Sequence, residues 1–359
     1  MRDILSDLDR WQREGESVAL ATVVQTWGSA PRGAGSKMGL ATNGQFSGSV
    51  SGGCVENAVI QAGLESLKMN RPQLLHFGVA DETAWEVGLA CGGSIDIFVK
   101  PLDKTFFEQL RSEIEDEQQA VTVTVIRGPD DILGREMLIH SDESVVGNIP
   151  NPWHEKILEL ANEIFLDGES RRAMLDGETE VFLEFISPPP MLVAVGGVHI
   201  TVALMSLAKT LGYRTVVIDP RSVWGNAQRF PNVDQLIQAW PDAAFEQIKI
   251  TRSTAIAMLT HDPKLDDSAL KIALNSPAFY VGALGSKTTN VKRRERLIRD
   301  GLSESQLSRL HAPIGLDLGA ETPQEIALAV MSEVVAAYRK REQLSAAHEA
   351  EADFRPVEN

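Results

Sequence analysis

The chain has 359 residues, and its 34 Lys and Arg against 50 Asp and Glu give a formal net charge of −16. This length predicts two domains, or three, each large enough to bury its own core. The acidic balance argues against surfaces for nucleic acid or anionic membranes, which need an excess of Lys and Arg. No apolar run is long enough to cross a bilayer, and residues 1–17 lack the apolar segment of a secretory signal, so we expect a cytoplasmic protein.

In chain order, residues 1–187 predict an α/β domain with a weak internal duplication. The first copy, about residues 18–101, contains the strand-like runs VALATVVQT and KMGLAT, the helical run NAVIQAGLESLKM and the strand SIDIFVKP. The second copy, about residues 121–187, repeats this order with VTVTVIRG, REMLIH, WHEKILELANEIF and EVFLEFISP. Glycine-rich loops and both cysteines occur only in the first copy, so we expect function there; the alternative is drift in unconstrained loops.

The segment GSVSGGCVE, residues 48–56, is the strongest local signal in the first copy. Glycine at this density indicates positive φ angles or the close approach of a ligand. Because the segment leads into a helix, we expect Cys54 in the first helical turn, where free N–H groups stabilise a thiolate or cradle an oxyanion. The alternative for Cys54 is a small buried side chain. The candidate cofactor-binding residues of this loop are Ser51, Gly52, Gly53, Cys54 and Glu56.

A second thiol stands in a similar setting, because Cys91 directly precedes Gly92 and Gly93. Cys54 and Cys91 are the only cysteines, with no CxxC pair and no zinc-like spacing, which excludes a disulfide framework. Two thiols beside Gly-Gly favour paired thiolate contacts to a soft metal centre; incidental core positions are the alternative. The residues of an earlier loop that could meet an anionic ligand, unless they form a solvated turn, are Ser29, Arg32 and Lys37.

The Pro-rich run at 188–190 opens a second domain, residues 188–341, which predicts a Rossmann-like, doubly wound parallel sheet. MLVAVGG is a continuous apolar run that ends in glycines, and helical and strand-like runs alternate after it. The segment TPQE predicts a helix N-cap with Pro at the first helical position and a capping box. Residues 342–359 are a polar tail without apolar periodicity.

The turn after MLVAV has the position of a dinucleotide-binding turn but not its residues. Gly196 stands at the first glycine position, whereas Val198 stands at the second and Thr201 at the third. Asp219 follows about twenty residues on, as a ribose-binding carboxylate would. The side chain of Val198 fills the space in which pyrophosphate approaches the backbone. The sequence therefore predicts a damaged fingerprint and argues against ordinary NAD binding.

Further candidates follow later strands, at the carboxyl ends where open α/β sheets bind ligands. His261 shares one strand end with Asp262, although a capping or core role is the alternative. Gly285 and Ser286 precede the basic run NVKRRER and resemble an anion-binding nest. The loop LHAPIGLDLG carries a further histidine, His311. The candidate ligand-binding residues of this domain are Gly196, His199, Asp219, Arg221, His261, Asp262, Gly285 and Ser286.

Taken together, these motifs resemble the XdhC/CoxI family, maturation factors for xanthine dehydrogenase and related molybdenum hydroxylases. The resemblance covers nearly the whole chain, through GSAPRGAGSKM, GSVSGGCVE, CGG, DPRSVWGNAQRFP, YVGALGSKTTNVKR and RLHAPIGLDLGAETPQEIALAV. The family's usual GAGHVA stretch is replaced by GGVHIT, which keeps only the first glycine, Gly196, and His199. This departure affects the Rossmann-like domain, whose ligand stays open.

The resemblance implies a chaperone rather than an enzyme. Such proteins bind molybdenum cofactor (molybdopterin), present it to a NifS-like cysteine desulfurase and deliver it to the apo-hydroxylase. Thiolates of Cys54 and Cys91 would suit molybdenum or its exchangeable sulfur. Two alternatives stay open: an NAD(P)-dependent oxidoreductase, and an assembly scaffold that holds no cofactor. The client hydroxylase and a possible homodimer are also left open.

Overall fold

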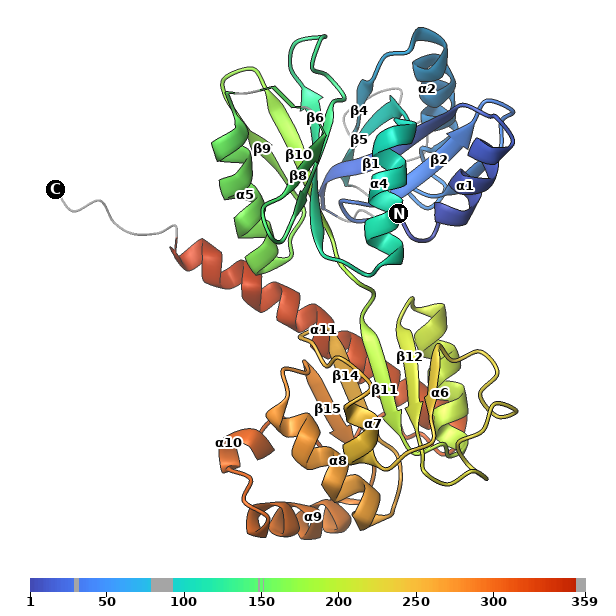
Figure 1. The fold of residues 1–359 in the computed structure, drawn as a ribbon, viewed down its shortest axis with the longest axis vertical. Coiled ribbons are helices and arrows are strands. Elements are labelled where there is room, and N and C mark those ends of the chain that lie inside the picture. Colours follow the sequence, from blue (N-terminus) through green and yellow to red (C-terminus); the bar gives the residue numbers. More distant parts are fainter. Residues whose placement is uncertain (29–31, 79–92, 148, 151, 353–359) are drawn as a thin grey trace, which may run out of the picture. The chain divides into compact units, whose positions relative to one another are not determined.

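The chain divides into two compact units, Met1–Pro188 and Pro189–Asn359. The computed structural model describes residues 1–28, 32–78, 93–147, 149–150 and 152–352 (Figure 1). Each unit has its own sheets, helices and hydrophobic core. The two units are therefore considered separately.

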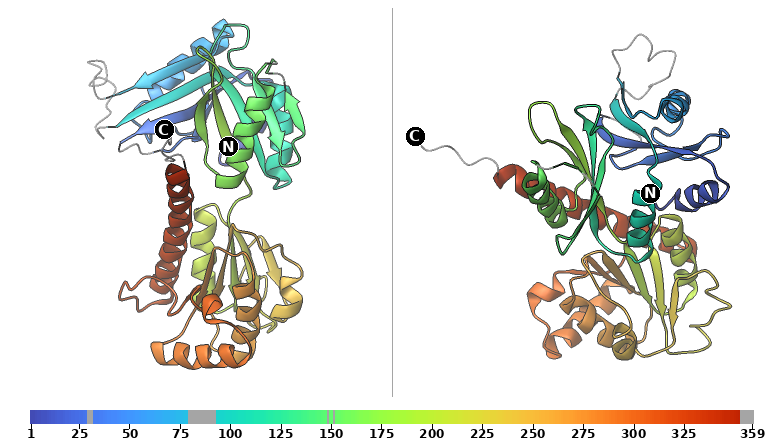
Figure 2. Two further views of the ribbon diagram at one scale, coloured as in Figure 1. Left: turned by 90° about the vertical axis from the view of Figure 1, so that its left-hand side faces the viewer. Right: turned by 45° about the horizontal axis from the view of Figure 1, so that its top comes forward.

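Unit 1 contains two antiparallel five-stranded sheets with the same strand order. The first sheet has the order β3-β2-β1-β5-β4 and the second the order β8-β7-β6-β10-β9. In the ribbon of Figure 2 the first sheet is blue to cyan and the second is green. The bounds of its elements are α1 (Leu5–Arg13), β1 (Val18–Trp27), β2 (Lys37–Ala41), β3 (Phe46–Gly48), α2 (Glu56–Met69), β4 (Gln73–Phe77), β5 (Ser94–Pro101), α4 (Lys104–Glu115), β6 (Ala120–Arg127), β7 (Glu136–His140), β8 (Val145–Gly147), α5 (His154–Asp167), β9 (Arg171–Met174) and β10 (Glu180–Ile186).

The shared strand order shows that the two halves of unit 1 are copies of one topology. Helix α2 packs on the first sheet and α5 on the second, each through an apolar face. Between the sheets lies a small core of four side chains, two from each copy. Val24 and Phe98 come from the first copy, and Ile126 and Phe182 from the second. The copies are thus joined by burial of the faces that α2 and α5 leave uncovered.

Unit 2 is a six-stranded parallel sheet with the order β13-β12-β11-β14-β15-β16. This is the 3-2-1-4-5-6 order of dinucleotide-binding folds, and the order reverses between β11 and β14. Apolar strand residues pack on two separate clusters, one on each face, which explains the continuous apolar runs in the sequence. The bounds are β11 (Met191–Val195), α6 (His199–Thr210), β12 (Arg214–Ile218), β13 (Gln235–Ile237), α7 (Pro241–Phe245), β14 (Thr254–Met258), α8 (Pro263–Asn275), β15 (Tyr280–Ala283), α9 (Lys287–Arg299), α10 (Glu304–Leu307), β16 (Leu310–His311) and α11 (Pro323–Ala352).

Helix α11 closes unit 2 and packs along α6. Its start has the predicted capping box: Glu325 N–H donates to the Thr322 hydroxyl, and the Glu325 carboxylate accepts from the Thr322 N–H. The helix continues to Ala352, so much of the predicted polar tail is helical. Among the described residues, no helix is long and apolar enough to span a membrane.

Candidate functional site

The Ser- and Gly-rich loop of the first copy closes around one of its own side chains. It begins after β3 at Gly48, and Glu56 at its far end turns its carboxylate back into the loop. That carboxylate accepts hydrogen bonds from the N–H groups of Ser51, Gly52 and Gly53 at 2.9, 3.0 and 2.8 Å. It also accepts from the Ser49 hydroxyl at 2.7 Å and from the Ser51 hydroxyl. Gly52 and Gly53 have φ angles of +79° and +121°, which only glycine adopts readily.

The N–H groups that surround an anion here belong to the loop before α2 rather than to the first helical turn, and the anion is a carboxylate of the chain itself. Partial burial acts to raise the pKa of Glu56, yet the hydrogen bonds from Ser51 and Ser49 hold it at about 2. Glu56 is thus an anion at any physiological pH. An external phosphate could use these N–H groups only by displacing it. The loop presents Gly52 and Gly53 to solvent in a fixed conformation.

The prediction that Cys54 lies in the first turn of the helix is wrong. Helix α2 begins at Glu56 with Val55 as its N-cap, so Cys54 precedes the helix by two residues. The N–H groups of Cys54 and Val55 both donate to the Ser51 hydroxyl, at 3.0 and 2.9 Å, which holds them away from helical hydrogen bonding. The Cys54 side chain is half-buried and packs against the core of the first copy, beside Val59 and other apolar residues.

The second half of the expected thiol pair cannot be placed. Cys91 and Gly92, like Ser29, lie outside the described residues. Gly93 is described and is buried directly before β5. Within the described parts of the chain, no three His, Cys, Asp or Glu side chains gather in a metal-binding group.

Arg32 and Lys37 line a cavity of about 340 Å³ at the boundary between the two copies. Lys37 is 4% exposed and forms a 2.7 Å ion pair with Glu184 of the second copy. Arg32 is exposed and makes no ion pair with any residue that the structure describes. Of the two predicted cations, Arg32 is thus the one able to meet an anionic ligand, while Lys37 joins the copies. Other polar side chains at this cavity are those of Asp3, Ser36 and Ser170.

A polar cluster that the sequence analysis missed lies at another part of the same boundary. The Asp96 carboxylate accepts from His76 Nδ1 at 2.5 Å and from Arg172 of the second copy. Arg172 also holds Glu180 with two hydrogen bonds, at 2.8 and 2.7 Å, and donates to Gln25 at 2.8 Å. The signal for this cluster is Asp96, the single carboxylate of the mostly apolar strand SIDIFVKP. Arg127 lies 3.6 Å from the Glu180 carboxylate, so two guanidinium groups face two carboxylates, and we interpret the cluster as a polar connection between the copies.

In unit 2, the glycine turn after β11 is covered by the segment that follows β12. Gly197 N–H donates to the Asp219 carboxylate at 2.8 Å, and Gly197 C=O accepts from Arg229 at 3.1 Å. A Cβ atom at Gly197 would lie 2.5 Å from the Trp224 carbonyl oxygen, so the backbones are in direct contact. Arg229 in turn lies over the Trp224 ring, 5.1 Å from its centroid. Both backbone hydrogen-bonding groups of Gly197 are therefore engaged within the chain.

Asp219 therefore has a different partner from the ribose that the sequence suggested. Its buried carboxylate holds the Arg221 guanidinium through two hydrogen bonds, at 2.9 and 2.8 Å. Burial acts to raise the pKa of Asp219, but hydrogen bonds from Arg221 and from the Gly197 N–H outweigh it and lower the pKa. Val198, which the sequence singled out, is the half-buried N-cap of α6 and packs against the core.

The remaining candidates at the carboxyl edge of this sheet are mostly helix caps. Asp262 caps α8 by accepting from Lys264 N–H at 2.9 Å, and Ser286 caps α9 by accepting from Thr289 N–H at 3.2 Å. Gly285 has a φ of +142° directly before this cap. His261 is exposed, and His199 is exposed beside the Trp224 ring, 6.1 Å away edge to face.

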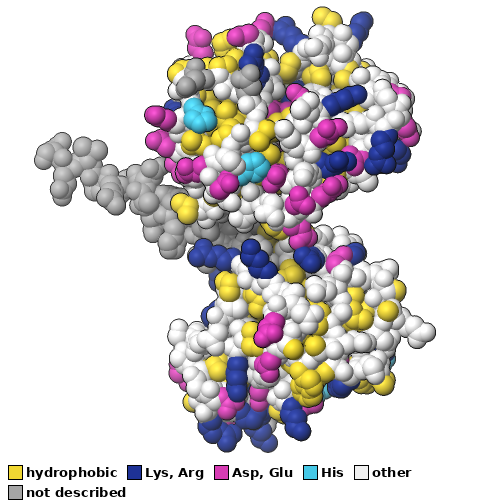
Figure 3. Space-filling model, viewed as in Figure 1, with side chains coloured by type: hydrophobic (Ala, Val, Ile, Leu, Met, Phe, Trp, Pro, Cys, Tyr) yellow, Lys and Arg dark blue, Asp and Glu magenta, His cyan; other side chains and the backbone are white. Residues whose placement is uncertain are grey.

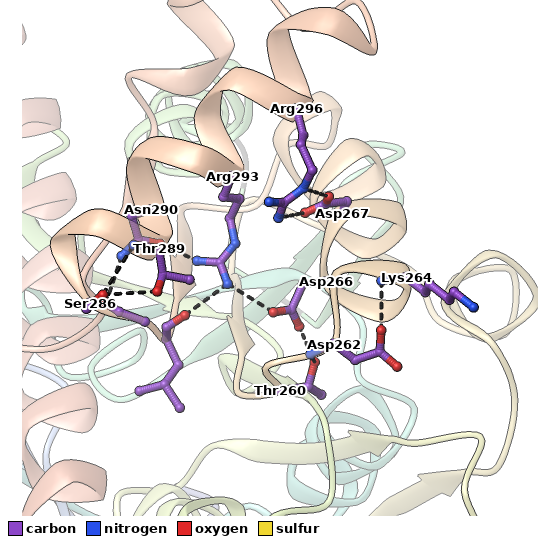
Figure 4. A network of polar contacts seen from close by, with 12 residues as sticks. Thr260, Asp262, Lys264, Asp266, Asp267, Ser286, Thr289, Asn290, Arg293 and Arg296 are labelled. Carbon is purple, nitrogen blue, oxygen red and sulfur yellow. Dashed lines mark hydrogen bonds and ion pairs between the residues drawn. The ribbon is translucent and has the colours of Figure 1, made fainter.

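A buried ionic network lies beneath these caps (Figure 4). Asp266 of α8 accepts from Arg293 of α9 at 3.0 Å and from the Thr260 hydroxyl. Arg293 also donates to the Leu284 carbonyl at 2.9 Å, so it joins the loops after β14 and β15. Burial raises the pKa of Asp266 to about 6, although Thr260 and Arg293 act to lower it. The network fixes the carboxyl edge of the sheet.

His311 belongs to a similar structural cluster on the other side of the sheet. Its Nδ1 lies 3.0 Å from the Glu333 carboxylate, which also accepts from the Tyr280 hydroxyl at 2.6 Å and from Gly315 N–H at 2.7 Å. Glu333 thereby attaches the LHAPIG loop to α11. His311 and Gly315 of this loop thus have structural roles, because both contact Glu333.

Comparison with known proteins shows which family models and relatives match this chain. The family model described as the XdhC and CoxI family matches residues 11–78, and the model described as the XdhC Rossmann domain matches residues 192–334. A relative in Bacillus subtilis (strain 168), described as a probable xanthine dehydrogenase subunit, is 28% identical over 91% of this chain and 95% of its own length. The molybdenum cofactor insertion chaperone PaoD of Escherichia coli (strain K12) is 25% identical over 89% of this chain and 83% of its own.

A solved structure shares the fold. The crystal structure of a xanthine dehydrogenase from Bacillus halodurans superimposes with a TM-score of 0.76, covering 94% of this chain and 96% of that chain at 22% identity. The two family models match opposite halves of the chain, and the residues of the Ser- and Gly-rich loop lie within the first. This chain is a member of the XdhC and CoxI family.

Proposed function

We propose that this protein holds molybdenum cofactor during sulfuration and inserts it into a molybdenum hydroxylase of the xanthine dehydrogenase type. The observation that carries the proposal is similarity along 89% of the chain to a relative named as a molybdenum cofactor insertion chaperone. A second relative, similar along 91% of the chain, is named for xanthine dehydrogenase. In this proposal a NifS-like cysteine desulfurase supplies the sulfur, and the chain itself catalyses no reaction.

The first copy of unit 1 offers the chemistry that this cargo needs. The half-buried thiol of Cys54 stands beside two exposed glycines on a loop whose shape Glu56 maintains. A soft sulfur ligand suits molybdenum or its exchangeable sulfur. Arg32, at the cavity between the copies, supplies an exposed cation for the terminal phosphate. We propose Cys54 and Cys91 as the paired thiols of the site.

An NAD(P)-dependent oxidoreductase is less well supported by this geometry. The strand order of unit 2 is that of dinucleotide-binding folds. However, both the N–H and the C=O of Gly197 are hydrogen-bonded within the chain, and the Trp224 backbone covers the turn. We therefore do not propose a nucleotide for unit 2.

The test is anaerobic titration of the full chain with molybdenum cofactor, followed by transfer to an apo-hydroxylase. We expect stoichiometric binding, and activation of the apo-hydroxylase above the level reached with free cofactor. Absence of both binding and transfer would overturn the proposal. Binding of the apo-hydroxylase without cofactor would instead support the assembly scaffold.

The role of the thiols is tested separately with Cys54→Ser, Cys91→Ser and the double variant. Serine keeps a small polar side chain but removes the soft ligand, so bound molybdenum per monomer should fall while the melting temperature changes little. Ser305→Ala, at an exposed position on α10, is the control for loss of molybdenum during purification. Full molybdenum occupancy in the double variant would remove the thiols from the site and leave the chaperone function intact.

A further inference from the structure

Helix α9 carries a concentration of positive charge on an acidic chain. Its sequence KTTNVKRRERLIR contains six cations and one carboxylate, whereas the whole chain has a net charge of −16. Dark blue side chains gather over α9 in the space-filling view (Figure 3). Two of the cations point inward: Arg293 binds Asp266, and Arg296 holds Asp267 with hydrogen bonds at 2.5 and 3.1 Å. These two attach α9 to α8.

The other cations of α9 face solvent around an apolar stripe. Val291 and Ile298 are 58% and 44% exposed, and they lie seven residues apart, two turns along one face of the helix. Arg294 pairs with Glu304 of α10, but Lys287, Lys292 and Arg299 form no ion pair with any described side chain. We call this surface the basic face; its residues are Lys287, Val291, Lys292, Arg294, Ile298 and Arg299.

A face of opposite charge and similar form lies on α5 in unit 1. Ile157, Ala161 and Ile164 bury one side of this helix. The opposite side exposes carboxylates, and at its end Leu166 is 85% exposed. Figure 3 shows acidic side chains on the part of unit 1 where α5 lies. We call this surface the acidic face; its residues are Glu155, Glu159, Asn162, Glu163 and Leu166.

We propose that the basic face of α9 docks on the acidic face of α5 of a second copy of this chain. Opposite charges steer such an encounter, and the exposed Val291 and Ile298 of α9 and the exposed Leu166 at the end of α5 supply apolar contact. A nucleic acid or an anionic membrane is a poorer occupant, because either would extend beyond α9 over the acidic remainder of the surface.

The contact is small, because one helix pair buries less than the roughly 1,200 Å² at which stable interfaces begin. The association should therefore be weak, concentration-dependent and sensitive to salt, as exposed charges are screened within about 8 Å at physiological ionic strength. Neither face includes a residue of the thiol loop, residues 48–56.

Sedimentation equilibrium of the full chain, in a concentration series at low and high salt, tests the proposal. The α9 reversal is Lys287→Glu, Lys292→Glu and Arg299→Glu, and the α5 reversal is Glu155→Lys, Glu159→Lys and Glu163→Lys. Each reversal alone puts like charges in contact and should weaken association at least tenfold. A 1:1 mixture of the two reversed proteins should restore association, because the α9 of one then faces the α5 of the other with opposite charge.

The matched control reverses three exposed lysines elsewhere, Lys68→Glu, Lys249→Glu and Lys264→Glu, and should leave association unchanged. All altered side chains are exposed, and circular dichroism checks that each variant is folded. Three results would overturn the proposal: a wild type that is monomeric throughout the series at low salt, a mixture that does not associate, or a control as weak as the reversals. A monomeric wild type whose α9 face binds an acidic partner protein would assign the face to that partner instead.

Discussion

Lys37 and Glu136 occupy equivalent positions in the two copies of unit 1, and each forms an ion pair across the boundary between the copies. Lys37 is aligned with Thr22 on β1, and Glu136 with Thr124 on β6. Lys37 pairs with Glu184, and Glu136 pairs with Lys100. Lys100 and Glu184 are themselves equivalent, each two residues beyond the phenylalanine of the shared core. The boundary is thus held by two reciprocal ion pairs, with both lysines on the first copy.

Removal of one partner of such a pair should be strongly destabilising. We expect Lys37→Met to lower the free energy of unfolding by about 3–5 kcal/mol, because it leaves the Glu184 carboxylate, 11% exposed, without its counter-ion. Replacing both residues with Met should recover most of that loss. Urea denaturation of the two variants measures this, and equal stability of Lys37→Met and wild type would contradict the assignment.

Glu56 should stabilise the fold in a pH-dependent manner. Its folded-state pKa of about 2 lies below the ordinary value of 4.5, so its contribution is complete above pH 4.5 and is lost as the pH falls toward 2. Glu56→Gln should therefore cost about 1 kcal/mol at pH 7, a value reduced by partial solvent screening, and less at pH 3. Glu65→Gln on the exposed side of the same helix is the control. A difference between wild type and Glu56→Gln that grows on acidification would contradict the prediction.

Arg293 should matter more than its neighbour Arg294. Arg293→Leu leaves Asp266 buried without its counter-ion and should cost about 3–5 kcal/mol, whereas Arg294→Leu breaks an exposed pair and should cost less than about 1 kcal/mol. The pKa of Asp266, about 6, already lies above its ordinary 3.8, so stability falls as the pH rises through this range. Without Arg293 the pKa rises further. Arg293→Leu should consequently lower the free energy of unfolding by more at pH 8 than at pH 5. Urea denaturation at the two pH values measures this difference.

Val198→Gly should not by itself create a nucleotide site. The Gly197 N–H and C=O stay engaged with Asp219 and Arg229, and the Trp224 backbone still lies against Gly197. Neither wild type nor the variant should show a rise in melting temperature with NAD, although binding to the folded state would produce one. A clear shift confined to Val198→Gly would show that the valine side chain alone closes the site.

The sequence predicted the fold well because its signals are local and repeated. The apolar run MLVAV predicts a buried parallel strand. The order of strand-like runs in residues 18–101 recurs in residues 121–187, and the two five-stranded sheets have the same strand order. The contacts of the candidate site are harder to predict, because spacing along the sequence does not show which group a side chain contacts. Glu56 was assigned to ligand binding but binds its own loop, and Asp219 binds Arg221. Asp96 was missed because its partner, Arg172, comes from the other copy.

The hydrogen bonds that Glu56 and Ser51 accept in the Ser- and Gly-rich loop all come from residues 49–55, and Ser49 N–H attaches the loop to Lys37 C=O of β2 at 3.1 Å. Such a segment keeps one conformation whether or not a ligand is present. A molecule that binds beside Gly52 and Gly53 therefore meets a surface that is already ordered. Association at this loop should be a single bimolecular step with a rate linear in ligand concentration, and release should be governed by the contacts alone. In the proposed function, such a loop would release its ligand to a partner protein without a preceding refolding step.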